Sequence, residues 1–193
     1  MSTYPNVALL LSAANPSHFP EDSGAEAAFA GRSNAGKSSA INALTGRRSL
    51  ARTAKTPGRT RLLNFFELSP GCRIVDLPGY GYAEASAAER ASWGPMIEAL
   101  AKRASLRGLF LIVDSRRGIL EGDEVLIAWA QAVNCPVHVL LSKSDKLKRA
   151  ELTKALAAVK SALGGRATLQ PFSAVDGTGL TEARSQLHRW LHK

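Results

Sequence analysis

The feature that most constrains this chain is an eight-residue segment near its N-terminus, G-R-S-N-A-G-K-S, at residues 31–38. It directly follows the apolar run of residues 27–30 and leads into a helix-like segment at residues 37–44. This order of strand, glycine-rich loop and helix is the one that a phosphate-binding loop requires. The glycines let consecutive N–H groups and the helix N-terminus converge on phosphate oxygens. The segment therefore predicts a nucleotide site, in which Lys37 reaches the β- and γ-phosphates and Ser38 ligates Mg²⁺.

Composition limits the class of protein and its partners. A chain of 193 residues predicts one domain with a well-buried core. Its 25 Lys and Arg against 16 Asp and Glu, a net charge of +9, favour a polyanionic partner, although a merely basic surface gives the same count. Cys72 and Cys135 lie in separate apolar runs, which predicts buried free thiols without a disulfide. The apolar run of residues 7–11 is too short for a membrane span or a secretory signal, so we expect a cytoplasmic protein.

Apolar periodicity predicts an α/β fold, because strand-like runs alternate with helix-like segments. The expected strands are residues 27–30, 62–68, 72–77, 108–114, 137–142 and 167–172, and the expected helices are residues 37–44, 84–102, 121–132, 149–163 and 179–192. A turn at residues 69–71 joins the second and third strands as a hairpin. We therefore predict a three-layer, doubly wound P-loop domain with a mostly parallel six-stranded sheet and one antiparallel edge strand. It would span residues 23–193, after an N-terminal extension of residues 1–22.

Ligands of doubly wound sheets bind at the carboxyl ends of the strands, and two polar motifs are expected near that edge. The first, D-L-P-G, begins at Asp76, whose carboxylate could hold Mg²⁺ through a coordinated water while the Gly79 amide meets the γ-phosphate. The second, K-T-P-G-R-T, occupies residues 55–60. We choose its Thr60 over Thr56 as the residue that binds Mg²⁺ when a triphosphate is present. This loop could then report the state of the nucleotide.

A third motif, S-K-S-D at residues 142–145, points to the base of the nucleotide. Asp145 could accept two hydrogen bonds from the N1–H and exocyclic amine of guanine, a donor pair that adenine lacks. The stem of Lys143 can lie over the base plane, and the dipeptide Ser173-Ala174 can offer a backbone amide to the guanine carbonyl oxygen. These residues predict a preference for GTP over ATP.

Taken together, these motifs have the order and spacing of a Ras-like GTPase domain. The longer strings GRSNAGKSS (31–39), KTPGRT (55–60) and DLPGYGYA (76–83) resemble the YihA/EngB/YsxC family of bacterial GTPases, as does V-D-S-R at residues 113–116. The resemblance implies binding of GTP and GDP with Mg²⁺, a role in late assembly of the large ribosomal subunit, and an association with cell division and septation. It places Mg²⁺ on Ser38 and Thr60. It places the nucleotide contacts on Gly31, Arg32, Ser33, Asn34, Ala35, Gly36, Lys37, Ser38, Gly58, Arg59, Thr60, Arg61, Leu62, Asp76, Leu77, Pro78, Gly79, Ser142, Lys143, Ser144, Asp145, Phe172, Ser173 and Ala174.

Two departures from familiar patterns bear on the chemistry. Ser142 stands where the guanine motif usually begins with Asn or Thr, so its contact with the phosphate loop should be weaker. Tyr80 stands where Ras has the Gln that orients the attacking water, so intrinsic hydrolysis should be slow. Asn34 resembles the K⁺ ligand of potassium-activated GTPases, although it could instead hold local backbone. We assign the catalytic roles to Lys37, Asn34 and Thr60.

Clustered basic residues suggest where the polyanion binds. They are Arg47, Arg48, Arg52, Lys55, Arg59 and Arg61, and they suggest an rRNA contact that changes with GTP, with solvated loop charge as the alternative. A second set, Lys102, Arg103 and Arg107, is explained in part by its place at a helix C-terminus. The prediction is a monomeric GTP-hydrolysing switch that docks on rRNA of the large ribosomal subunit. A small-molecule kinase and a non-catalytic GTP-binding adaptor remain as alternatives.

Overall fold

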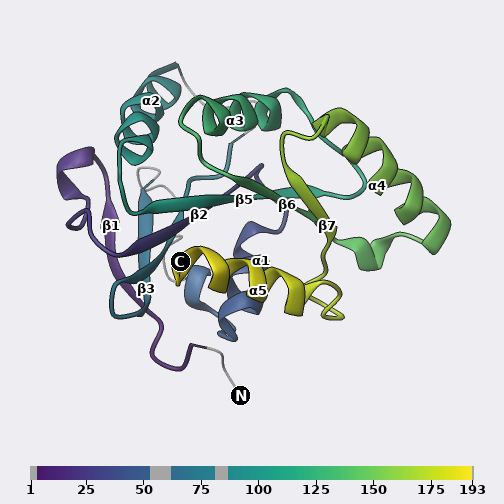
Figure 1. Ribbon diagram of the computed structural model, residues 1–193, viewed down its shortest axis with the longest axis horizontal. Helices are drawn as coiled ribbons and strands as arrows, with labels where there is room; N and C mark the ends of the chain where they lie inside the picture. The colour runs from purple at the N-terminus through teal and green to yellow at the C-terminus, as the bar shows by residue number, and fades with distance from the viewer. Residues whose placement is uncertain (1–3, 53–61, 81–86, 193) are drawn as a thin grey trace.

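The computed structural model describes residues 4–52, 62–80 and 87–192, which form a three-layer α/β domain (Figure 1). Its strands are β1 (Ala8–Ala13), β2 (Ala25–Gly31), β3 (Leu63–Ser69), β4 (Cys72–Asp76), β5 (Leu106–Asp114), β6 (Val137–Ser142) and β7 (Thr168–Pro171). Its α-helices are α1 (Lys37–Thr45), α2 (Ala87–Ala101), α3 (Glu121–Ala132), α4 (Arg149–Leu163) and α5 (Leu180–Leu191). Short 3₁₀ helices occur at η1 (Pro16–His18), η2 (Leu50–Arg52) and η3 (Ser144–Lys146).

The sheet confirms the predicted class and corrects its strand count. Its seven strands run in the order β1-β3-β4-β2-β5-β6-β7, whereas six were expected. The additional strand, β1, pairs antiparallel with β3 from Ala8 opposite Glu67 to Ala13 opposite Leu63. Since β3 is also antiparallel to β4, β3 is the reversed strand and β1 covers its outer side. The apolar run of residues 7–11 is short, and its role as a strand follows from its pairing with β3.

Two hydrophobic cores form because the central strands bury side chains on both faces of the sheet. Along β2, Ala27 and Phe29 pack with α1 and α5, whereas Ala28 and Ala30 pack on the other face with α2, α3 and α4. Figure 1 shows the two groups of helices on opposite sides of the sheet. Such double burial explains why these strands read as continuous apolar runs in the sequence. No helix in the described part of the chain is both long and apolar enough to cross a membrane.

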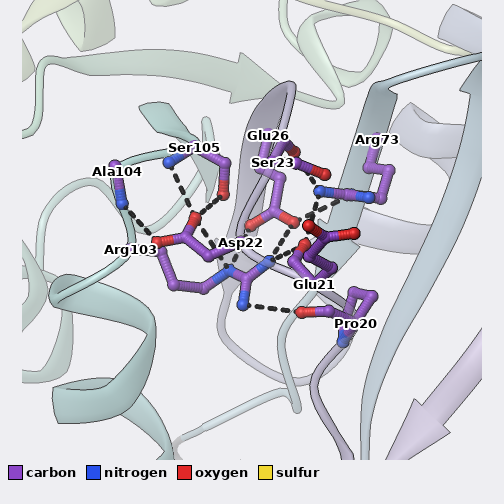
Figure 2. Close-up of polar contacts among 9 residues, drawn as sticks. All are labelled: Pro20, Glu21, Asp22, Ser23, Glu26, Arg73, Arg103, Ala104 and Ser105. Carbon is purple, nitrogen blue, oxygen red and sulfur yellow. Dashed lines mark hydrogen bonds and ion pairs between the residues drawn. The ribbon is translucent and has the colours of Figure 1, made fainter.

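The amino end of β2 is tied to its neighbours by a charged cluster (Figure 2). We call it the ionic clasp, and it consists of the buried side chains of Glu26, Arg73 and Arg103 together with the more exposed Asp22. Glu26 is fully buried and accepts hydrogen bonds from Arg73 Nε at 2.9 Å and from Arg103 Nε at 2.7 Å. Asp22 accepts from the Ser105 hydroxyl at 2.6 Å and from two backbone N–H groups. Arg103 is therefore held by Glu26, in addition to lying just after the C-terminus of α2.

The predicted burial of both cysteines is confirmed. Cys72 and Cys135 are buried free thiols in the two opposite cores. Burial raises the pKa of the Cys135 thiol to about 12, so this group is a protonated, apolar-like core residue.

Candidate nucleotide-binding site

The phosphate loop, residues 31–38, joins β2 to α1 and has the backbone geometry of an anion cradle. A Cβ at Gly31 would lie 2.8 Å from the Ile112 carbonyl oxygen, so glycine is needed where β2 passes β5. Gly36 precedes α1 with a φ of 102°, a conformation that favours glycine. The N–H groups of Asn34, Gly36 and Ser38 have no hydrogen-bond partner among the described residues. A helix N-terminus with open N–H groups attracts phosphate.

Hydrogen bonds from Ser142 and Lys143 fix the orientation of the peptide groups in this loop. The Ser142 hydroxyl donates to the Ala35 carbonyl at 2.5 Å, and the Lys143 ammonium donates to the Asn34 carbonyl at 2.6 Å. The carbonyl and N–H of one trans peptide point in opposite directions. Fixing the Ala35 carbonyl on Ser142 therefore turns the Gly36 N–H away from the S-K-S-D segment.

Ser142 makes the contact with the phosphate loop that we expected to be weakened by the absence of an Asn. Its hydroxyl lies 2.5 Å from the Ala35 carbonyl oxygen and 3.1 Å from that of Val113. A hydroxyl has one proton to share between these two acceptors, whereas a carboxamide has two. The contact is thus present, and the serine makes it with a single donor.

The structure describes three of the predicted metal and phosphate residues, which are Lys37, Ser38 and Asp76. The Lys37 ammonium forms an ion pair with Asp76 at the end of β4, and both side chains are almost fully buried. The Ser38 hydroxyl oxygen is also buried, and it has no hydrogen-bond partner in the described part of the chain. Buried hydroxyls are normally satisfied, so an unpaired one on the residue that follows Lys37, the partner of Asp76, fits a Mg²⁺ ligand. The residues present therefore fit the metal that the motif implies.

The S-K-S-D segment and the loop after β7 meet where the base was predicted to bind. Asp145 accepts a hydrogen bond from the Ser173 hydroxyl at 2.8 Å and pairs with Lys146 at 3.0 Å. Hydrogen bonds from Lys146 and then Ser173 lower the pKa of Asp145, which stays ionised and able to accept from a base. The Ser173 N–H donates to Thr178, whereas that of Ala174 has no partner among the described residues. The open amide of this dipeptide is thus that of Ala174.

Several predicted contact residues turn out to be core residues. The side chains of Leu77 and Phe172 are buried, and their N–H groups donate to the carbonyls of Phe29 and Leu141. Each remains near the site through its backbone position alone. Leu62 and Pro78 are partly exposed at the same edge of the sheet. Gly58, Arg59, Thr60 and Arg61 lie outside the described residues, as do Lys55 and Thr56.

Tyr80 contacts a neighbouring helix through its side chain and the phosphate loop through its backbone. Its hydroxyl donates to Asp123 of α3, and its ring packs so closely on Gly122 that an added Cβ would lie 3.0 Å from it. Burial and then the Asp123 charge raise the pKa of Tyr80, which keeps the phenol protonated. The backbone carbonyl of Tyr80 accepts from the Ser33 N–H at 2.9 Å. Tyr80 thus links the D-L-P-G segment to both α3 and the phosphate loop.

Asn34 has a geometry that bears on its two predicted roles. Its backbone has a φ of 64°, and its side chain is exposed. Within the described ranges this side chain makes no hydrogen bond, so the alternative that it holds local backbone receives no support. The oxygen of its carboxamide is available to a ligand at the edge of the loop.

The basic cluster is divided by the structure. Arg47 and Arg48 are both exposed, and the Arg47 guanidinium also donates to the Pro5 carbonyl of the N-terminal segment. The Arg52 side chain and the residues 55, 59 and 61 are not among those whose side chains are described. Both described side chains of the cluster thus face solvent, and the Arg47 side chain is also tied to the N-terminal segment.

A cavity of about 280 Å³ lies beside the phosphate loop and includes residues that the sequence analysis did not assign to the site. It is lined by Arg32 and Asn34 of the loop, Asp114 and Arg116 at the end of β5, Asp123 of α3 and Lys143. Asp114 follows an apolar strand just as Asp76 does, so the rule that found Asp76 could have found it.

This arrangement of a mostly parallel sheet, a phosphate loop after β2, a carboxylate ending β4 and an S-K-S-D segment after β6 defines a P-loop GTPase. The sequence profile of a family described as "50S ribosome-binding GTPase" matches residues 26–143. Curated relatives include the probable GTP-binding protein EngB of Coxiella burnetii (strain RSA 493 / Nine Mile phase I), 47% identical over 192 residues, with 97% of this chain and 94% of the relative covered. EngB of Vibrio cholerae (strain M66-2) is 44% identical, with 97% of this chain and 87% of the relative covered.

The chain belongs to the EngB family of GTP-binding proteins, and it is a GTPase. Solved structures agree on the fold. The crystal structure of a probable GTP-binding protein EngB superposes with a TM-score of 0.71 at 23% identity, covering 86% of this chain and 98% of that one. Era in complex with MgGDPNP and a segment of 16S ribosomal RNA superposes with a TM-score of 0.64 at 21% identity, covering 89% of this chain and 58% of that one.

Proposed function

We propose that this protein is a GTP-driven switch in assembly of the large ribosomal subunit, whose GTP-bound form docks on rRNA. The observation that carries the proposal is the family match over residues 26–143, since that family is described by its binding to the 50S ribosome. The net charge of +9 supports a polyanionic partner. The roles in cell division and septation, the cytoplasmic location and the monomeric state belong to the same proposal. Residues 23–193 act as the GTP-binding domain, and the extension of residues 1–22 adds strand β1 to the sheet of that domain.

The phosphate loop binds the triphosphate through its backbone and two side chains. The open N–H groups of Asn34, Gly36 and Ser38 donate hydrogen bonds to phosphate oxygens. Lys37 adds a positive charge at the base of the loop. Ser38 and Thr60 would hold Mg²⁺, and the Asp76 carboxylate would supply it with a negative charge. When bound, Mg²⁺ offsets negative charge on the β- and γ-phosphates.

Selection of guanine rests on Asp145 and Ala174. The ionised Asp145 accepts from the base edge, and the open Ala174 N–H donates to the carbonyl oxygen of guanine. These two groups favour a GTPase over the alternative of a small-molecule kinase, which has no need of a carboxylate at this position. Competition of ATP and GTP for the site separates the two classes.

Hydrolysis is assisted by a monovalent cation beside Asn34. Tyr80 cannot orient water as a Gln does, and its hydroxyl is committed to Asp123. A K⁺ ion bound by the Asn34 carboxamide would offset charge that develops between the β- and γ-phosphates. We expect faster initial rates in K⁺ than in Na⁺ at equal ionic strength, and Asn34→Ala should narrow the difference. Equal wild-type rates would rule out the cation, and the absence of single-turnover hydrolysis with ribosomes would favour the adaptor.

Cosedimentation with large ribosomal subunits tests the switch itself. Binding should be tighter with GTP than with GDP, and log affinity should fall linearly with log salt because phosphate contacts release counterions. Arg48→Ala should reduce that slope by about 1 if Arg48 contacts RNA. Arg107→Ala is the matched control, since Arg107 is also an exposed arginine but lies in strand β5, outside the basic cluster. Equal binding in GTP and GDP would contradict the switch.

A further inference from the structure

Asp114 occupies a position where the topology brings two parts of the site together. It is the last residue of β5 and lies in register with Ser142, the last residue of the neighbouring parallel strand β6. Its side chain is 7% exposed. The carboxylate that ends β5 therefore lies beside the start of the S-K-S-D segment, which follows β6.

Both oxygens of Asp114 are engaged by cations. Oδ2 accepts from Lys143 Nζ at 2.9 Å and from Arg116 Nη2 at 2.8 Å. Oδ1 accepts from Arg116 Nε and from the Arg116 N–H, both at 3.0 Å. The same Lys143 ammonium donates to the Asn34 carbonyl of the phosphate loop at 2.6 Å. Lys143 thus bridges a buried carboxylate and the loop that is expected to hold phosphate.

Asp114 carries a permanent negative charge in this setting. Burial acts to raise its pKa, but hydrogen bonds from Arg116 and Lys143 outweigh burial and hold the pKa well below its usual range. The backbone of Lys143 is also unusual, with a φ of 58° that a residue with a side chain adopts rarely. A fixed anion at this point gives the Lys143 ammonium one defined place.

We propose that Asp114 is a positioning residue for guanine nucleotides, which acts by holding the Lys143 ammonium on the Asn34 carbonyl. The aliphatic stem of Lys143 is then positioned to lie over the plane of the base. The phosphate loop is fixed before a nucleotide binds. A long lysine side chain loses rotamer freedom when it is ordered, so ordering it in advance lowers the cost of binding. The inference rests on the proposed role of the S-K-S-D segment at the base.

A double-mutant cycle on GDP binding tests this role. Asp114→Asn should weaken GDP binding roughly tenfold, the effect expected for loss of a hydrogen bond to a charged group. In a Lys143→Met background the same substitution should have almost no further effect, because the group that it positions is gone. Additive losses would overturn the proposal, since a purely structural carboxylate acts whether or not Lys143 is present.

Arg116→Ala is the matched control for the other partner of Asp114. Arg116 is half exposed, and its loss leaves the contact between Asp114 and Lys143 in place. GDP affinity should change by less than about twofold, as for exposed ion pairs. A loss as large as that of Asp114→Asn would show that Asp114 serves the shape of its own loop instead. Asp114→Glu, which keeps the charge, takes the place of Asp114→Asn in the cycle if the latter fails to fold.

Two further variants separate this inference from the proposed function. Asp145→Asn and Lys143→Met test the base site directly, and both should weaken GDP binding. If neither does, the assignment of the S-K-S-D segment to the base is wrong. If both do while Asp114→Asn binds GDP normally, the base site stands and the positioning role of Asp114 is wrong.

Discussion

The two ends of the parallel sheet differ in whether all of their buried polar groups have partners within the protein. At the amino end, the charges of the ionic clasp have partners within the protein (Figure 2). Glu26 accepts hydrogen bonds from Arg73 and Arg103. Asp22 accepts hydrogen bonds from the Ser105 hydroxyl and the Ala104 N–H. At the carboxyl end, buried hydroxyls stay without a hydrogen-bond partner among the described residues, and they belong to Ser38 and Ser144. Open N–H groups of the phosphate loop lie at this same end.

This difference separates residues that serve the fold from residues that serve a ligand. A buried polar group without a partner costs roughly 1–3 kcal/mol, whereas a satisfied one contributes modestly to stability. Such an unpaired polar group is expected where a bound ligand supplies the missing partner. The clasp should therefore determine stability and leave nucleotide binding unchanged, and the phosphate end should do the reverse.

The largest expected effect is at the clasp. Glu26→Gln removes the charge that two buried guanidinium groups share, which leaves them uncompensated, and should lower the free energy of unfolding by about 3–5 kcal/mol. Urea unfolding measures this loss, and GDP affinity of the folded fraction should stay within about twofold of wild type. Glu21→Gln is the matched control, because Glu21 is exposed and makes its contacts here through its backbone carbonyl. A parallel loss of GDP affinity would show that the two ends are coupled.

A smaller effect of opposite kind is expected at Ser38. Ser38→Ala removes an unpaired buried hydroxyl, so stability without nucleotide should be unchanged or higher by up to about 1 kcal/mol. The Mg²⁺-dependent part of GTP affinity should fall about tenfold or more. Ser39→Ala, on the exposed side of the same helix, should change neither quantity. If Ser38→Ala destabilised the protein without nucleotide, the hydroxyl would serve the fold and the comparison would fail.

The smallest effect concerns the response of the clasp to acid. Burial acts to raise the pKa of Asp22, but hydrogen bonds from Ser105 and Ala104 outweigh it and lower the pKa to about 2. Because the folded pKa lies below the unfolded value of 3.8, this stabilisation is present above about pH 4 and is lost as the pH falls towards 2. Asp22 is partly exposed, so screening limits the contribution to under about 1 kcal/mol.

Asp22→Asn should accordingly flatten the loss of stability between about pH 4 and pH 2, as measured by urea unfolding at each pH. At neutral pH the variant should be slightly less stable than wild type. Equal slopes for wild type and Asp22→Asn would show that the carboxylate contributes nothing to acid sensitivity.

The sequence predicted most of the fold where the signal was local. Helix α3 and strand β6 lie where periodicity placed them, because alternating burial leaves its mark within a few residues. The phosphate loop was recognised for the same reason, since its glycines and Lys37 act within one turn of chain. Strand β1 was missed because its short apolar run acquires meaning only through its pairing with β3.

What the sequence by itself determined is the chemistry of the site: the loop residues 31–38, the carboxylates Asp76 and Asp145, and a basic surface. Only the tertiary structure decided which polar groups find hydrogen-bond or ion-pair partners within the protein. The pairs Glu26–Arg103 and Asp114–Lys143 join residues 77 and 29 positions apart. Such contacts follow from the order of strands in the sheet, which no local pattern records. Whether a buried polar group serves the fold or awaits a ligand is therefore a property of packing.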